Sequence, residues 1–174
     1  RNARSIFVIE ELRLITFVLP SRNNLDFLKG AYASIRALNQ AHYVLILDDA
    51  STDGTQKWIQ ELKDPRLLVF HNPGPQRIGI VGMFDKGISM APTEIIFAFH
   101  ADMVAAPGLD EAVLKLLKPK TVVCATRVEP PLHPKGPEKI VEDFGVEASE
   151  FDMNRFASWA TLEIQKNKGK VTKG

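Results

Sequence analysis

Hydrophobic residues gather in short, unbroken runs along the chain. Five runs of four to six residues are apolar almost throughout, instead of alternating with polar residues. A strand whose two faces are both covered by helices has this pattern, so the runs predict strands of a mainly parallel sheet. The predicted strands are residues 14–19, 43–47, 67–70, 94–99 and 121–125.

Between these runs, apolar residues recur at spacings of three and four, which is the repeat of one helical face. The helical stretches begin near Leu25, Trp58, Val81 and Leu109. A later one covers residues 153–165, with Met153, Phe156, Ala160 and Ile164 on one face. The alternation of strand and helix predicts an α/β fold, a three-layer α/β/α sandwich with a mainly parallel central sheet.

The composition changes near residue 127. Five of the eleven prolines lie between Lys118 and Lys139, and residues 129–137 are typical of an extended proline-rich segment. We therefore expect an N-terminal extension, an α/β core, and a proline-rich segment that leads into a C-terminal helix. The expected boundaries of these three parts are residues 1–13, 14–127 and 128–174.

Charge and cysteine content narrow the classes of function. Lys and Arg number 22 against 21 Asp and Glu, a net charge of +1, so no general attraction to nucleic acid or an anionic membrane is expected. No apolar run approaches the roughly 20 residues of a transmembrane helix, and no signal-peptide pattern is present. With a single cysteine, Cys124, the chain suits a reducing compartment, and we expect a cytoplasmic protein. Because it begins with Arg1 and ends in a Lys-rich stretch, we expect it to be part of a longer or trimmed polypeptide.

Polar segments follow four of the predicted strands, at residues 20–24, 48–54, 71–79 and 100–103. In an open α/β sheet, ligands bind at the carboxyl ends of the strands, so these segments are expected to share one binding rim. No Gly-rich phosphate loop and no Gly-x-Ser-x-Gly elbow occurs, which disfavours dinucleotide-binding, P-loop and α/β-hydrolase proteins.

The second strand ends in a pair of carboxylates. Asp49 lies directly beyond the buried run, where ligand binding is favoured, because a carboxylate accepts hydrogen bonds from a base imide or a ribose hydroxyl. Asp48 is expected to accept backbone N–H groups of a neighbouring loop. Thr52 and Asp53 precede a predicted helix, so capping is their favoured role.

His100 and Asp102 lie two residues apart on a segment expected to be extended, which would direct both side chains to the same side. Such a pair is a candidate site for Mg²⁺ or Mn²⁺, which also binds phosphate oxygens. A buried, hydrogen-bonded His and a capping Asp form the other interpretation, which spacing alone favours. Two roles for Arg77 stay open: contact with a diphosphate, or a solvated charge on the loop.

Four segments taken together resemble the family 2 glycosyltransferases, which have the Rossmann-like GT-A fold. They are residues 15–23, 45–55, 79–88 and 96–103, and the resemblance extends from residue 14 to about 117. The most specific of them is the string Asp-Asp-Ala-Ser-Thr-Asp-Gly-Thr, which matches the family's second strand end. The fourth segment matches the end of the family's DxD-type strand.

The resemblance implies transfer of a sugar from a nucleotide diphosphate sugar, with UDP favoured, to an acceptor that the sequence does not identify. It implies Mn²⁺ or Mg²⁺ as cofactor. Asp49 would hydrogen-bond the base, and Pro20 and Arg22 would lie in the loop around base and ribose. The candidate nucleotide-binding residues are Pro20, Ser21, Arg22, Asn23, Asp49, Arg77 and Ala101, and the candidate metal ligands are Asp102 and His100.

Two positions depart from the family pattern. His100 occupies the first carboxylate of the DxD-type motif, and Phe84-Asp85 stands where the family has Arg-Asn. About seventy residues follow Asp102, and the Glu142-Asp143 pair among them is expected on a solvated helix turn. The catalytic base is therefore left unknown.

The sequence is interpreted as the nucleotide-sugar-binding half of a metal-assisted, inverting glycosyltransferase, and the activity of this fragment alone is left open. A non-catalytic nucleotide-sugar-binding domain with an incomplete site is the alternative. A related nucleotidyltransferase fits less well, because no Gly-rich, basic triphosphate loop follows the first strand.

Overall fold

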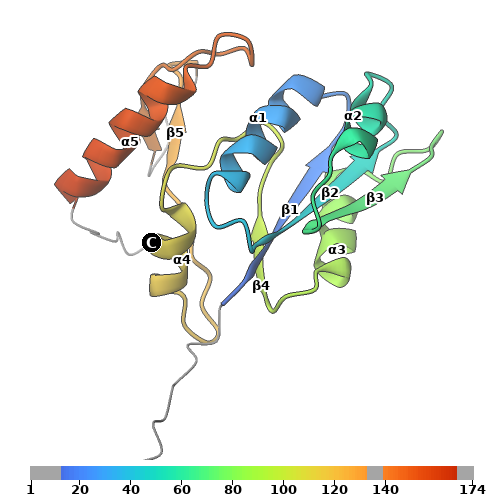
Figure 1. The fold of residues 1–174 in the computed structure, drawn as a ribbon, viewed down its shortest axis with the longest axis horizontal. Helices are drawn as coiled ribbons and strands as arrows, with labels where there is room; N and C mark the ends of the chain where they lie inside the picture. Colours follow the sequence, from blue (N-terminus) through green and yellow to red (C-terminus); the bar gives the residue numbers. More distant parts are fainter. Residues whose placement is uncertain (1–12, 133–138, 168–174) are drawn as a thin grey trace, which may run out of the picture.

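The computed structural model describes residues 13–132 and 139–167. Strands and helices alternate through most of the chain (Figure 1). The elements are β1 (Ile15–Ser21), α1 (Leu25–Arg36), β2 (Tyr43–Asp49), α2 (Thr55–Glu61), β3 (Leu67–Asn72), α3 (Ile80–Met90), β4 (Ile95–Ala98), α4 (Leu109–Leu116), β5 (Arg127–Glu129), β6 (Lys139–Val141) and α5 (Met153–Asn167).

The main sheet has four strands in the order β3-β2-β1-β4, and every neighbouring pair is parallel. β1 pairs with β2 on one side and β4 on the other, and all seven of its residues are buried. The unbroken apolar runs thus predicted the parallel sheet correctly.

The side chains of β1 divide between two apolar clusters, one on each face of the sheet. Phe17 and Leu19 join a cluster with Leu28 of α1, whereas Val18 joins one with Met83 of α3. α3 comes so close that a Cβ atom at Gly87 would overlap a methyl group of Val18. Helices lie on both faces of the sheet (Figure 1), which confirms the three-layer sandwich.

The predicted fifth strand is wrong. Residues 121–125 have no regular structure, and Val122 is 89% exposed. A strand needs a hydrogen-bonding neighbour as well as apolar residues, and this run has none among the described residues. A short parallel pair of β5 and β6 follows it instead, with Val128 opposite Ile140.

The C-terminal helix forms as predicted. Phe156 and Ala160 of α5 are buried with Phe144, while Ile164, expected on the same face, is 51% exposed. Glu142 does not lie on a helix turn, because it directly follows β6. The expected N-terminal extension before residue 13, the part of the proline-rich segment at 133–138, and the chain end after 167 lie outside the described residues.

Polar side chains join α1 and α4 to the amino end of the sheet, opposite the carboxyl ends of the strands. The buried His42 accepts the N–H of Ile15 at its Nδ1 (3.2 Å) and lies 3.1 Å from Asp110 through its Nε2. Asp64 accepts the Tyr32 hydroxyl at 2.6 Å and pairs with the Arg36 Nε at 2.7 Å. These contacts fix α1 and leave the carboxyl ends of the strands open for a site.

Candidate functional site

The loops that follow β1 and β2 are tied together by hydrogen bonds. Asn23 accepts the N–H of Thr52 at its side-chain oxygen, at 2.7 Å. Asp53 accepts the N–H of Leu25 at one oxygen (2.9 Å) and the N–H of Thr55 at the other (3.1 Å). Neither expected cap is the N-cap of α2, which is Gly54. Asp53 binds the first N–H of α2 and the start of α1, whereas Thr52 binds Asn23.

Asp49 anchors the loop that follows β3. Its carboxylate is only 4% exposed and accepts the Asn72 side-chain amide at 2.7 Å. It also accepts the N–H groups of Ile78 and Gly79, each at 2.9 Å, and the Arg77 Nε lies 4.0 Å away. The side chain predicted to bind a ligand thus spends most of its hydrogen-bonding capacity on the protein, which shapes the rim at this point.

Burial by itself would raise the pKa of Asp49, because a low dielectric disfavours the charged form. The hydrogen bonds from Ile78, Asn72 and Gly79, together with the Arg77 charge, outweigh burial and lower the pKa below its ordinary value. The pKa values of Asp53 and Asp64 are lowered in the same way, against burial, by hydrogen bonds to their charged forms.

These three lowered pKa values predict acid sensitivity. A carboxyl whose pKa is lower in the folded state stabilises the fold above its unfolded pKa of about 3.9 and loses that contribution as pH falls through the folded value. We expect a melting temperature that is level from pH 7 to about 4 and falls below that. Calorimetry across this range tests it, with Asp64→Asn expected to flatten the slope. A melting temperature that rises on acidification would contradict the prediction.

Asp48 has the structural role expected of it. It is buried, accepts the N–H of Ser51 at 3.1 Å and lies 3.0 Å from Nδ1 of His71. His71 also lies 3.0 Å from the amide of Gln56. Neighbouring residues of a strand face opposite sides, so Asp48 and Asp49 stabilise different loops.

The remaining candidates on the rim differ in accessibility. Pro20 and Ser21 are buried in β1, whereas Arg22 and Arg77 are exposed. The Ser21 hydroxyl has no hydrogen-bond partner among the described residues and no contact with solvent. A ligand could therefore reach Ser21 only after a shift of the β1 loop, while both arginines are reachable directly.

The candidate metal ligands lie on a turn, not on an extended segment. β4 ends at Ala98, and the Met103 N–H donates to the carbonyl of His100 at 3.2 Å, which makes residues 100–103 a turn. His100 and Asp102 are exposed on either side of the buried Ala101. The His100 ring packs edge-on against Phe84, with ring centres 5.4 Å apart. The interpretation of His100 as a buried, hydrogen-bonded residue is therefore wrong as well.

The strand order places Asp49 and the His100–Asp102 turn on the two sides of β1. β2, which ends at Asp49, and β4, which leads to His100, are the two neighbours of β1. No hydrogen bond or ion pair joins Asp49 to the 100–102 turn within the described parts of the chain. A ligand that spans the end of β1 could contact both groups.

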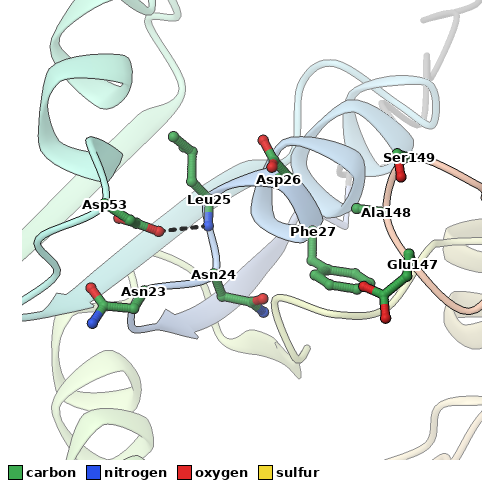
Figure 2. Close-up of a pocket in the computed structure, with 9 residues that line it drawn as sticks. All are labelled: Asn23, Asn24, Leu25, Asp26, Phe27, Asp53, Glu147, Ala148 and Ser149. Carbon is green, nitrogen blue, oxygen red and sulfur yellow. Dashed lines mark hydrogen bonds between the residues drawn. The ribbon is translucent and has the colours of Figure 1, made fainter.

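Two cavities adjoin this end of the sheet. The first, the rim cavity, has a volume of about 760 Å³ at the start of α1. Figure 2 shows Phe27 directed from α1 toward Glu147 and Ala148, with Asn24 beside it. Three carboxylates, those of Asp26, Asp53 and Glu147, line this cavity, and no described Lys or Arg does. Like charges repel, so the rim cavity disfavours a diphosphate.

The second, the aromatic cavity, has a volume of about 600 Å³ and lies between the 100–104 turn, α1 and the C-terminal segments. His100 and Asp102 line it, and Asp26, Phe27, Glu147 and Ala148 line both cavities. The aromatic and sulfur-containing side chains that line it are Phe27, Phe97, Phe99, Met103, Phe144, Phe151, Met153, Phe156 and Trp159.

The donor set of the turn limits what cation it could hold. No group of three His, Cys, Asp or Glu side chains that could hold a metal occurs among the described residues. His100 and Asp102 supply one imidazole and one carboxylate, and both are exposed. Divalent ions such as Mn²⁺ accept these ligands and take phosphate oxygens and waters at their other positions. The pair thus fits a metal only together with an oxygen-rich ligand.

Sequence reasoning missed the aromatic cavity. It predicted the stripe of Met153, Phe156 and Ala160 on the last helix, but periodicity does not tell which surface such a stripe covers. Gly30 of α1 also lines the cavity, and the sequence does not predict this, because low helix propensity is the only property that distinguishes a glycine within a helix.

No described helix is both long and apolar enough to cross a lipid bilayer.

Comparison with known proteins bears on both fold and site. The sequence profile described as Glycosyl transferase family 2 matches residues 16–156, which include every candidate residue of the rim. No curated protein matches the chain.

The solved structure of a mannosyltransferase has a similar fold. The mannosyltransferase PcManGT from Pyrobaculum calidifontis, solved in complex with GDP-Man and Mn²⁺, is 25% identical with a TM-score of 0.54, over 65% of this chain and 35% of that one. S. aureus TarS 1-349 is 18% identical with a TM-score of 0.46, over 51% of this chain and 27% of that one. The chain thus spans about a third of the mannosyltransferase.

Proposed function

Because the chain belongs to glycosyl transferase family 2, we propose that it is the nucleotide-sugar-binding part of an inverting glycosyltransferase. Its reaction transfers a sugar from a nucleotide diphosphate sugar to a hydroxyl group of an acceptor. The acceptor oxygen bonds to the anomeric carbon as the bond from that carbon to the diphosphate breaks. A general base takes the hydroxyl proton, and the diphosphate leaves with the bonding electron pair.

The observation that carries the proposal is the family match, which spans both sides of the β1 end. On one side, the Asp49-anchored loop and the exposed Arg22 and Arg77 are available to base, ribose and diphosphate. On the other side, His100 and Asp102 face the aromatic cavity. A nucleotide placed across the end of β1 would bring its diphosphate toward the turn and its sugar toward the cavity.

His100 and Asp102 are the residues that would hold a divalent cation. Bound there, Mn²⁺ or Mg²⁺ would neutralise negative charge on the diphosphate. The solved mannosyltransferase complex with GDP-Man and Mn²⁺ supports this use of a metal. Asp102 would attract the ion by its charge, and His100 would donate a lone pair while the Phe84 ring holds its imidazole in place.

A non-catalytic nucleotide-sugar-binding domain is the second candidate function. The observation that favours it is the weak metal set, since His100 replaces a carboxylate and the described residues offer no third ligand. Such a domain would bind the nucleotide sugar as the enzyme does but would not transfer the sugar.

Two measurements on the same protein test the proposal. Calorimetric titration with UDP, GDP and CDP in the presence of Mn²⁺ is expected to show saturable binding, with UDP the tightest. Release of nucleotide diphosphate from a panel of UDP- and GDP-sugars, with hydrolysis counted as turnover, separates the enzyme from the binding domain. Absence of binding by every nucleotide, in a protein that melts cooperatively, would overturn both candidates.

A further inference from the structure

One wall of the aromatic cavity is apolar, so a ligand that carries only hydroxyl groups would leave it uncovered. Phe151, Met153 and Trp159 are each half-buried at this wall, although Phe144 behind them is almost fully buried. Phe144 packs against Trp159 with ring centres 5.4 Å apart, so the wall is a connected aromatic surface. A cavity of about 600 Å³ lies in the range that takes up a small organic ligand.

The charges around the cavity restrict the ligand further. Five carboxylates line it, those of Asp26, Asp102, Glu129, Glu142 and Glu147. Arg127 is the only described Lys or Arg in the lining. It pairs with Glu129 at 3.0 Å, and Lys139 pairs with the same carboxylate at 2.8 Å. Away from the turn that would hold the cation, a carboxylate or phosphate on the ligand would meet repulsion from Asp26, Glu142 and Glu147, which favours an uncharged head group.

The aromatic cavity adjoins the turn at which the proposed reaction would take place. His100 and Asp102, the groups placed beside the diphosphate, line the same cavity as the aromatic wall. A ligand whose apolar part covers that wall therefore holds its polar end near the turn. Resting on the proposed function, we infer that the acceptor is a neutral amphiphile, an uncharged hydroxyl-bearing head group on an aliphatic chain, and that the chain binds in the aromatic cavity.

Gly30 offers a way to fill the cavity without harming the fold. It lies within α1 and lines the cavity, and a Cβ atom added there meets nothing within 4 Å. Leucine is favoured over glycine in a helix, so Gly30→Leu should keep or raise stability while its side chain enters the cavity. Ala33→Leu adds the same side chain to an exposed position of α1 outside the cavity lining and is the matched control.

Trp159 provides the readout. The sequence has two tryptophans, and the other, Trp58, packs against Tyr32 on the far side of α1, with ring centres 5.7 Å apart. A Trp58→Phe background therefore isolates the fluorescence of Trp159. Octyl β-D-glucoside below its critical micelle concentration serves as the neutral amphiphile, methyl β-D-glucoside as the head group alone, and sodium decanoate as an anionic amphiphile.

The expected result is a saturable change in Trp159 emission with octyl glucoside and none with methyl glucoside. Gly30→Leu is expected to weaken octyl glucoside at least tenfold, Ala33→Leu to leave it unchanged, and decanoate to bind at least tenfold more weakly. No saturable response, equal binding of decanoate, or an unchanged affinity in Gly30→Leu would each overturn the inference. UDP titrated into the same protein separates the two failures, since bound UDP without bound octyl glucoside leaves the proposed function standing.

Discussion

Replacement of Asp49 by alanine is expected to lower nucleotide diphosphate affinity at least tenfold and to reduce stability by about 3 kcal/mol. The stability loss follows from the donors that the carboxylate now satisfies. Asn72 loses one of the two acceptors of its amide and keeps the Gln76 carbonyl, and Ile78 and Gly79 lose the acceptor for their N–H groups. Each buried donor left without a partner costs about 1–3 kcal/mol, and the exposed parts of the loop recover some of that from water.

The affinity loss has two physical sources. One carboxylate oxygen accepts two hydrogen bonds, but the other accepts only the Gly79 N–H within hydrogen-bond distance and retains an acceptor position for a ligand. The loop that carries Arg77 is also held in place by Asp49, so its release moves a cation that the proposal places near the nucleotide. Titration of UDP measures the affinity, and urea unfolding measures the stability.

Asp48→Ala is the matched control for this experiment. Asp48 is equally buried and adjacent in sequence, and it also accepts a backbone N–H, that of Ser51. Its removal should destabilise the protein with little effect on UDP. Equal loss of affinity in both variants would mean that general loosening is responsible, and unchanged affinity in Asp49→Ala would remove Asp49 from the site.

The sheet and its helices could be predicted because the central strands β1 and β2 lie between two helical layers. Burial on both faces makes β1 and β2 apolar almost throughout, and that pattern is visible without any knowledge of the fold. The wrong strand at 121–125 has the same composition. Pairing with a neighbour decides between the two cases, and pairing is a property of the tertiary structure that one run does not encode.

The site could be predicted only in part, for a similar reason. That Asp49, His100 and Asp102 follow strands is a local fact, and the topology then brings them to the two sides of β1. That Asp49 is occupied by the loop after β3 depends on contacts with Ile78 and Gly79, 29 and 30 residues away. The sequence likewise predicts an extended segment at residues 100–103, where the structure has a turn, because a short apolar run does not mark where the hydrogen bonds of its strand end.

Addition of Mn²⁺ is expected to have the second large effect on UDP affinity. A nucleotide diphosphate carries negative charge that the rim offsets only with the exposed Arg22 and Arg77. A divalent cation held by Asp102 adds two positive charges beside the diphosphate. We therefore expect Mn²⁺ to tighten UDP binding at least tenfold, and EDTA to reverse the effect.

The two candidate ligands should respond unequally. Asp102→Ala is expected to abolish the dependence on Mn²⁺, because it removes the negative charge that attracts the ion. His100→Ala should weaken the dependence less, since a neutral imidazole contributes a lone pair but no charge. Glu111→Ala, which removes an exposed carboxylate on α4 outside both cavities, is the control and should bind UDP like the parent.

Stability measurements on the same variants separate a metal ligand from a structural residue. Asp102 and His100 are exposed, and no hydrogen bond to either side chain occurs among the described residues, so their removal should leave the melting temperature nearly unchanged. If Asp102 instead only stabilises the turn at residues 100–103, Asp102→Ala would lower the melting temperature, and UDP affinity in the parent would be indifferent to EDTA. Titration of UDP with and without Mn²⁺ into the parent and the three variants distinguishes these outcomes, because only a ligand couples the cation to the nucleotide.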